Sequence, residues 1–302
     1  MDNQPDNLWD GKSRGGHFGY QFFVSVIRLL GISSAYCFLA FVVIYFIPFA
    51  PKATKSIWKY YRNIIGTGRL RSCINLYLHY YVFGQTLIDK TAMRAGLAGR
   101  FKYKFDNYPR FLDILNSGNG VIMIGAHIGC WEAGSTFFGE YGEKINIVML
   151  DAEHQEIKKV LDGNSKQHDG HKTIPVGTDG LELMLRIKSA LNKGEYICFN
   201  GDRYTDIKHT AKMSFCKHSA YFPTGPFLTA VRCQVPVIFY YAVREKNRTY
   251  RFIFEEADTD SVHNADRLLA RYVGSIEKIL EQYPHQWFNF YNFWNLMNTD
   301  TI

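Results

Sequence analysis

The most extended hydrophobic pattern lies near the start of the chain, where residues 29–51 form 23 consecutive positions without a charged side chain. A helix needs about 20 such residues to cross a bilayer. Arg28 and Lys52 close the run, and Pro48 and Pro51 can end or kink the helix. The pattern predicts a membrane anchor helix at about residues 28–50. This helix either spans the bilayer or lies at its interface, and a buried helix of a soluble protein is the alternative.

Beyond this run, short apolar segments of strand length alternate with segments that have helical periodicity. An aromatic-rich helix is predicted at residues 72–83. Strands are predicted at 121–126, 145–150, 172–176, 195–200, 235–243 and 251–255, and helices at 133–141, 155–161, 181–192, 227–233 and 265–282. This alternation predicts an α/β fold with a central mixed, partly parallel sheet flanked by helices and an N-terminal hydrophobic membrane helix. We expect an N-terminal segment at 1–51 and one α/β domain at 52–302.

The overall composition excludes several classes of protein. Hydrophobic residues make up 47% of the 302 residues and charged residues 21%, which is typical of a packed core and excludes a largely disordered chain. The six cysteines form no CxxC pair, which excludes a zinc ribbon or a thioredoxin-type site and favours reduced thiols in a cytosol-facing protein. The sequence has neither a metal-ligand cluster nor a dinucleotide fingerprint, so we expect no cofactor.

The positive charge is concentrated directly after the apolar run. Residues 52–110 carry a net charge of +10, although the whole chain carries only +7. Such a basic surface attracts phosphate in anionic lipid or in nucleic acid, and solvated helix faces are the simpler interpretation. Because the block follows an apolar anchor and no nucleic-acid motif is present, we expect an anionic membrane surface and no nucleic acid. Six basic residues from Lys52 to Arg71 indicate the cytoplasmic side of the cytoplasmic membrane.

A histidine and a glutamate form the main candidate for chemistry. His127 follows the apolar segment 121–126, and Glu132 comes five positions later. Residues five apart on one helix diverge by about 140°, so the two can meet only if His127 lies on a turn and Glu132 in the first helical turn. A carboxylate that holds a histidine makes it a general base. By spacing alone, a histidine that binds a backbone group at a strand end explains the pattern equally well.

The order of these features resembles the lysophospholipid acyltransferase superfamily, most closely its bacterial lipid A late acyltransferases. In that family a His-x4-Asp/Glu motif is the catalytic dyad. Three more segments are similar to family blocks: Gly-Asp-Arg at 201–203, Phe-Pro-Thr-Gly-Pro at 222–226 and Tyr-Pro-His-Gln-Trp at 283–287. The opening Trp-Asp-Gly-Lys-Ser-Arg-Gly-Gly at 9–16 resembles a less characterised side branch, which leaves the acceptor open.

The resemblance implies a membrane-associated acyltransferase. It would move a fatty acyl group from an acyl thioester, on acyl carrier protein or coenzyme A, to a hydroxyl or amine of a lipid or glycolipid. His127 would then be the general base, Glu132 would orient it, and attack by the Cys130 thiol is the rival route. A non-catalytic membrane lipid-binding protein that retains the fold is the alternative function.

Four further residues are candidates for substrate binding. Arg203 could hold a phosphate or carboxylate of the acceptor with its planar guanidinium, or it could form a structural salt bridge. Asp202 could orient Arg203 or turn the chain. Thr224 and Gly225 precede a predicted helix, whose first N–H groups could hold an anion or the oxyanion, or they could form a simple turn. We expect the segment 283–287 to contribute packing.

Overall fold

A seven-stranded mixed sheet forms the centre of the computed structural model, which describes residues 17–130, 133, 141–150, 172–176, 180–204, 206–258 and 260–294. The strand order is β1-β9-β8-β2-β5-β3-β4. Neighbours are parallel, except that β8 and β9 are antiparallel. The strands are β1 (Lys102–Asp106), β2 (Val121–Gly125), β3 (Ile145–Leu150), β4 (Lys172–Val176), β5 (Tyr196–Asn200), β8 (Val237–Glu245) and β9 (Thr249–Glu256). A separate hairpin pairs β6 (Thr210–Phe215) with β7 (His218–Pro223).

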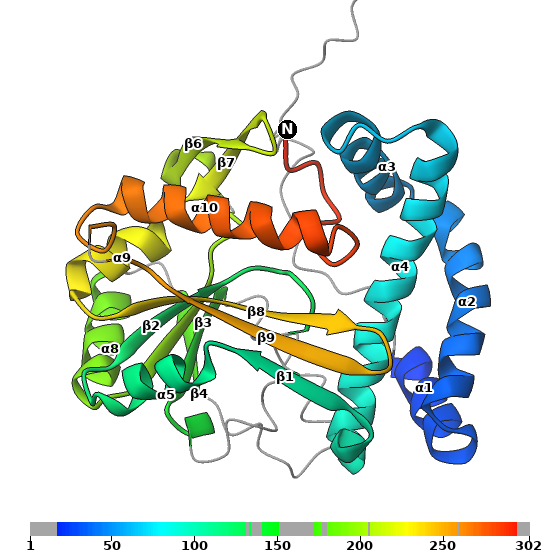
Figure 1. Cartoon of the computed structure of the whole chain (residues 1–302), viewed down its shortest axis with the longest axis horizontal. Helices are drawn as coiled ribbons and strands as arrows, with labels where there is room; N and C mark the ends of the chain where they lie inside the picture. The colour runs from blue at the N-terminus through cyan, green and yellow to red at the C-terminus, as the bar shows by residue number, and fades with distance from the viewer. Residues whose placement is uncertain are drawn as a thin grey trace, which may run out of the picture.

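Helices flank this sheet and also form a group at one end of it (Figure 1). Helix α10 (Ala265–Gln282) crosses one face of the sheet. The group at the end consists of α1 (His17–Leu30), α2 (Ile32–Phe49), α3 (Pro51–Lys59) and α4 (Arg69–Ala92). The other α-helices of the described residues are α5 (Tyr108–Asn116), α8 (Gly180–Asn192) and α9 (Gly225–Cys233). The predicted α/β class, with helices around a mixed sheet, is confirmed.

The core lies where β2 and β8 run side by side below α10. All five residues of β2 are buried, as expected for a central parallel strand that is covered on both faces. Tyr272 of α10 is fully buried, and its hydroxyl donates to the carbonyl of Gly125 at 2.6 Å. The nitrogen of Gly201, just after β5, donates to the same carbonyl at 2.9 Å. These bonds fix the ends of β2 and β5 relative to each other.

Most of the N-terminal apolar run forms one helix, α2, close to the predicted residues 28–50, although the first two residues of the run belong to the end of α1. Gly31 has a φ of +85° and separates α1 from α2, because this left-handed conformation interrupts a helix and suits glycine. Helix α2 is the one described helix that is long and apolar enough to cross a membrane by length and composition. Pro48 lies inside α2 and Pro51 opens α3, so Pro48 does not end the helix.

Most predicted elements agree with the structure within a few residues. Helix α10 has its predicted bounds, whereas α4 begins three residues before the predicted 72–83 and ends nine residues after it. Strands β1, β6 and β7 were not predicted, since each has at least two polar side chains among its five or six residues. The helix predicted at 155–161 and most of that at 133–141 lie outside the described residues. The division into segments 1–51 and 52–302 remains a prediction.

Candidate active site

His127 lies on the turn that follows β2, which agrees with the expectation from the sequence that it follows a strand. Its main-chain oxygen accepts a hydrogen bond from the nitrogen of Phe288 at 2.8 Å, which fixes the turn against the C-terminal segment. The side chain is 19% exposed, so the ring is held by the protein but remains accessible from one side. A histidine in this position can exchange a proton with a bound molecule.

Asp202 is the carboxylate that holds His127 among the described residues. Its Oδ1 lies 2.8 Å from Nδ1 of His127, and its Oδ2 accepts the main-chain N–H of His127 at 2.9 Å. Because a carboxylate only accepts hydrogen bonds, Nδ1 of His127 carries a proton, so in the neutral form of the ring the lone pair is on Nε2. Burial by itself raises the pKa of Asp202, but the positive charges of His127 and Arg203 and the hydrogen bonds from His127 outweigh burial and lower the pKa to about 2. Asp202 is therefore charged at neutral pH.

The strand order explains why these two residues meet. Strands β2 and β5 are parallel neighbours, with Gly125 opposite Asn200 at their carboxyl ends. His127 and Asp202 each follow their strand by two residues, so both side chains emerge at the same edge of the sheet. Ligands of α/β proteins bind at this edge. The prediction that Asp202 binds substrate remains untested, and its contacts favour a role in positioning His127.

Gly129 lets the turn after His127 pack directly on β8. It has a φ of +66°, and a Cβ at this position would lie 2.0 Å from the oxygen of Ala242. The next residue, Cys130, donates its N–H to that same oxygen at 2.8 Å. Any larger residue at 129 would push the His127 turn away from the sheet. Cys130 is 4% exposed, which leaves its thiol poorly placed for attack on a soluble thioester.

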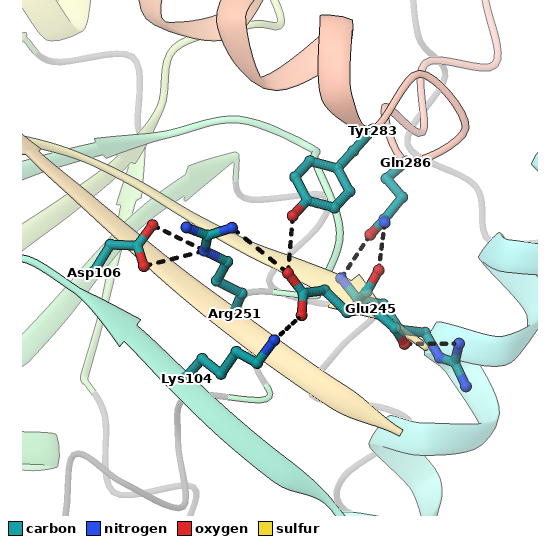
Figure 2. A network of polar contacts seen from close by, with 7 residues as sticks. Lys104, Asp106, Glu245, Arg251, Tyr283 and Gln286 are labelled. Atoms are coloured by element: carbon teal, nitrogen blue, oxygen red, sulfur yellow. Dashed lines mark hydrogen bonds and ion pairs between the residues drawn. The ribbon is translucent and has the colours of Figure 1, made fainter. Parts of the chain in front are cut away.

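The Tyr-Pro-His-Gln-Trp segment at 283–287 supports the site more directly than the expected packing role. The indole N–H of Trp287 donates to Oδ2 of Asp202 at 3.0 Å. Gln286 pairs with the main chain of Arg244 on β8, accepting from its nitrogen and donating to its oxygen at 2.7 Å each (Figure 2). The main-chain oxygen of Gln286 accepts a further hydrogen bond from the main-chain nitrogen of Gly129 at 2.8 Å. The segment thus joins β8, the His127 turn and Asp202.

Arg203, the next residue after Asp202, has a structural contact. Its Nη2 donates to the main-chain oxygen of Phe288 at 3.0 Å. That bond occupies part of the guanidinium and links it to the segment that also holds His127. The hydrogen bond to the carbonyl of Phe288 supports a structural role for Arg203. A role in binding an anionic group stays a prediction.

Thr224 and Gly225 lie at the start of α9, as predicted, but Thr224 bonds to His209 and not to the residues around His127. The Thr224 hydroxyl donates to the oxygen of His209 at 3.1 Å, and its main-chain nitrogen donates to the same oxygen at 3.0 Å. No hydrogen bond joins either residue to His127 or Asp202 within the described part of the chain. Their predicted role in binding an anion stays a prediction.

Glu132, the second member of the predicted dyad, lies outside the described residues. Its predicted contact with His127 stays a prediction. Among the residues that the structure does describe, no group of three His, Cys, Asp or Glu side chains could hold a metal ion.

A small cleft lies between residues 56–64, His79 of α4 and the C-terminal segment, and Trp287 contributes to its lining. Within the described ranges, Nε2 of His79, the hydroxyl of Tyr60 and both amide atoms of Asn289 have no hydrogen-bond partner although they are buried. Burial lowers the pKa of His79 to about 3, so its ring is neutral at pH 7. Buried polar atoms of this kind are usually paired, and water or a polar group of a ligand can pair them.

Comparison with known proteins places this chain in a family. A family model described as bacterial lipid A biosynthesis acyltransferase matches residues 88–295. The matched region includes His127, Asp202 and the segment 283–287, and it begins inside α4. A search of curated proteins found no match.

Proposed function

Because this chain belongs to the bacterial lipid A biosynthesis acyltransferase family and is an acyltransferase that acts on lipid, we propose the following specific reaction. The protein moves a fatty acyl group from an acyl thioester to a hydroxyl or amine of a membrane lipid or glycolipid. The donor is a thioester of acyl carrier protein or coenzyme A. The observation that carries the proposal is the His127–Asp202 pair, in which a buried charged carboxylate holds a partly exposed histidine.

In the proposed reaction His127 is the general base. Its Nε2 takes the proton of the acceptor hydroxyl, and the oxygen attacks the thioester carbonyl to form a tetrahedral oxyanion. When the carbon–sulfur bond breaks, the imidazolium returns the proton to the departing thiolate, so ester and thiol are formed and the enzyme is unchanged. Asp202 fixes the tautomer of His127 and stabilises its imidazolium, which is how a buried carboxylate assists a histidine base. An amine acceptor would follow the same steps.

Other predicted residues have supporting roles in this proposal. Glu132 orients His127 together with Asp202. Arg203, whose Nη2 also donates to the main-chain oxygen of Phe288, holds an anionic group of the acceptor through its positive charge. Thr224 and Gly225 present the first N–H groups of α9 to an anion or to the oxyanion.

We also propose that the protein works at the cytoplasmic face of the cytoplasmic membrane. Helix α2 is predominantly apolar and carries no charge, and basic residues follow it without a compensating acid as far as residue 88. The cytoplasmic leaflet carries a negative surface potential that attracts such a cluster. A lipid acceptor would then reach the enzyme from the bilayer.

Replacing His127 by alanine tests the reaction. The His127→Ala variant should consume acyl thioester about 10²–10⁴ times more slowly than the wild type, because it lacks the base. His263→Ala is the matched control, since His263 is exposed and lies outside the site. Thiol release is measured with a thiol-reactive dye in the presence of membrane lipid. Equal rates in the wild type and His127→Ala would reject His127 as the base, and a folded wild type without any turnover would favour the lipid-binding alternative.

A further inference from the structure

Helix α2 has two apolar faces, and the described residues bury only one of them. Ile32, Ala35, Leu39 and Val43 are buried at spacings of three and four residues, so they form one helical face. Phe38, Phe41, Ile44, Tyr45 and Phe49 are 46–71% exposed. Leu29 and Leu30 at the end of α1 are also exposed. We call these seven exposed residues the outer face.

The covered face of α2 is attached along the length of α4 (Figure 1). A Cβ at Gly84 would lie 2.4 Å from Cδ1 of Leu39, so the absence of a side chain at 84 lets α2 approach closely. The hydroxyls of Tyr81 and Tyr77 donate to the oxygens of Tyr36 and Ala40, on successive turns of α2. Helix α2 is therefore held side by side with α4 and does not project from the molecule.

Helix α4 in turn packs against the C-terminal segment and the central sheet. The ring of Phe83 contacts that of Phe288, with centroids 4.9 Å apart, and Phe288 binds the main chain of His127. Asp89 of α4 forms a buried ion pair with Arg244 of β8. If α2 crossed a bilayer, it would carry α4, this ion pair and the C-terminal segment into hydrocarbon. Charged side chains are costly there even when they are paired, and main chain that is neither helical nor part of a closed sheet is tolerated only where protein covers it.

The charges around the outer face fit an anionic lipid surface. Arg28 lies beside Leu29, and Lys55 follows α2 within two turns; both are exposed. Arg69 and Arg71 at the start of α4 are exposed as well. Between residues 11 and 88 the sequence contains no acidic residue. Several large apolar side chains exposed along one helix, with exposed basic residues close to them in the sequence and no acid nearby in the sequence, are typical of a surface that binds a membrane.

We propose that the outer face is a monotopic docking surface that lies in the interface of an anionic bilayer, with α2 parallel to the membrane plane. The helix is about 27 Å long at 1.5 Å per residue, and it inserts one face without crossing. Helix α4 then separates the lipid from the segment that holds His127, so the site stands one helix layer from the membrane surface. The mode of docking rests on the proposed membrane association but not on the proposed chemistry.

Depth measurements at three positions of α2 test the orientation. Ser33→Cys, Phe41→Cys and Phe49→Cys are made in the full chain with the six native cysteines replaced by alanine, and folding is checked by circular dichroism. Each variant carries an environment-sensitive fluorophore and is bound to phosphatidylglycerol–phosphatidylcholine vesicles that contain quenchers at two depths. All three labels should lie at a similar shallow depth. A label at Phe41 in the bilayer centre, with Ser33 and Phe49 at opposite surfaces, would overturn the proposal.

A charge-insertion pair with native cysteines tests the surface independently. Phe41→Glu/Ile44→Glu should weaken partitioning to the same vesicles at least about tenfold. Leu181→Glu/Leu185→Glu on α8 is the matched control, because these side chains are 70% and 60% exposed against 71% and 62%. The control should bind like the wild type. If the outer-face variant binds vesicles normally but converts a wild-type dimer to a monomer, the face is an interface between copies and the proposal fails.

Both outcomes are separable from the chemistry. His127→Ala should bind vesicles like the wild type, and the outer-face variant should retain thioester turnover with detergent-dispersed acceptor. Loss of turnover in His127→Ala with unchanged docking supports both proposals. Normal docking of the outer-face variant rejects the docking surface, whatever the turnover.

Discussion

Two buried aspartates, Asp202 and Asp89, differ in what their partners can do. Both are almost fully buried, at 1% and 0% exposure, and each accepts three or more hydrogen bonds. Asp202 faces His127, whose ring is partly exposed and can gain or lose a proton. Asp89 faces Arg244, which keeps its charge at any ordinary pH, and the hydroxyls of Tyr36 and Tyr250.

This difference in partners distinguishes the candidate active site at Asp202 from a structural contact at Asp89. The Asp202 pair stands at the carboxyl ends of two parallel strands, and its histidine reaches solvent. The Asp89 group joins α2 and α4 to β8 and is closed, with the guanidinium of Arg244 stacked 5.2 Å from the centre of the Tyr36 ring. Burial raises the pKa of Asp89, against the opposing charge of Arg244. A buried carboxylate thus indicates chemistry only when its partner is titratable and accessible.

The largest expected effect is on catalysis at Asp202. Asp202→Asn should lower kcat for acyl transfer about 10²–10⁴-fold and leave KM for the donor nearly unchanged, because the amide no longer stabilises the imidazolium of His127. Asp89→Asn, assayed on folded protein at low temperature, should keep kcat within about threefold. Steady-state kinetics over a pH series measure both.

Glu132→Gln completes this experiment. If Glu132→Gln loses turnover while Asp202→Asn retains more than a tenth of it, the contact at Nδ1 of His127 is structural and the glutamate is the orienting residue. A similar loss in both variants would assign the two carboxylates a shared role.

The next effect in size is on stability at Asp89. Asp89→Asn should lower the free energy of unfolding by about 3–5 kcal/mol, because Arg244 would remain buried without its carboxylate. Asp106→Asn is the control: Asp106 pairs with Arg251 near the surface, and its loss should cost less than about 1 kcal/mol. Urea denaturation followed by circular dichroism measures both. Equal effects at the two sites would mean that burial does not distinguish them.

The sequence predicted His127 but could not pair it with Asp202. Both residues follow predicted strands, and that signal was available. Their meeting depends on β5 lying next to β2, although β3 and β4 come between them in the sequence. Local patterns contain no information on that order. For the same reason Trp287 was assigned to packing, since its bond to Asp202 spans 85 residues.

The N-terminal region shows the same limit for helices. The absence of charge from residue 29 to 51 predicted an apolar helix, and α2 lies within it. The break at Gly31 was missed because an apolar run does not show which glycine adopts a positive φ. The covering of one face of α2 by α4 depends on Gly84 and on tyrosines about 40 residues away, so no pattern within α2 could reveal it.

Acid should affect Asp202 in a defined pH window. Its pKa is lowered to about 2 in the folded protein, against about 3.9 in an unfolded chain. Its contribution to stability is therefore present above pH 4 and is lost as the pH falls toward 2, at up to about 1.4 kcal/mol per pH unit. As the pH is lowered from 5 to 3, the urea concentration at the midpoint of unfolding should fall more steeply for the wild type than for Asp202→Asn. Parallel curves would show that Asp202 does not gain its charge-stabilising contacts on folding.

The smallest effect is expected in the polar network on β1, β8 and β9, where carboxylates meet cations near the surface (Figure 2). Lys104 donates to Glu245 at 2.6 Å, and Glu245 also accepts from the hydroxyl of Tyr283 at 3.0 Å. Lys104 is exposed, so water replaces most of what the pair contributes. Lys104→Gln should change the free energy of unfolding by less than about 1 kcal/mol, with that small loss decreasing further in 1 M salt. Denaturation of the two proteins at low and high salt measures it. If Lys104→Gln lowered the free energy of unfolding as much as Asp89→Asn, charge pairs in this protein would contribute to stability independently of burial. The roles of Asp202 and Asp89 could then not be distinguished by the surroundings of the two residues.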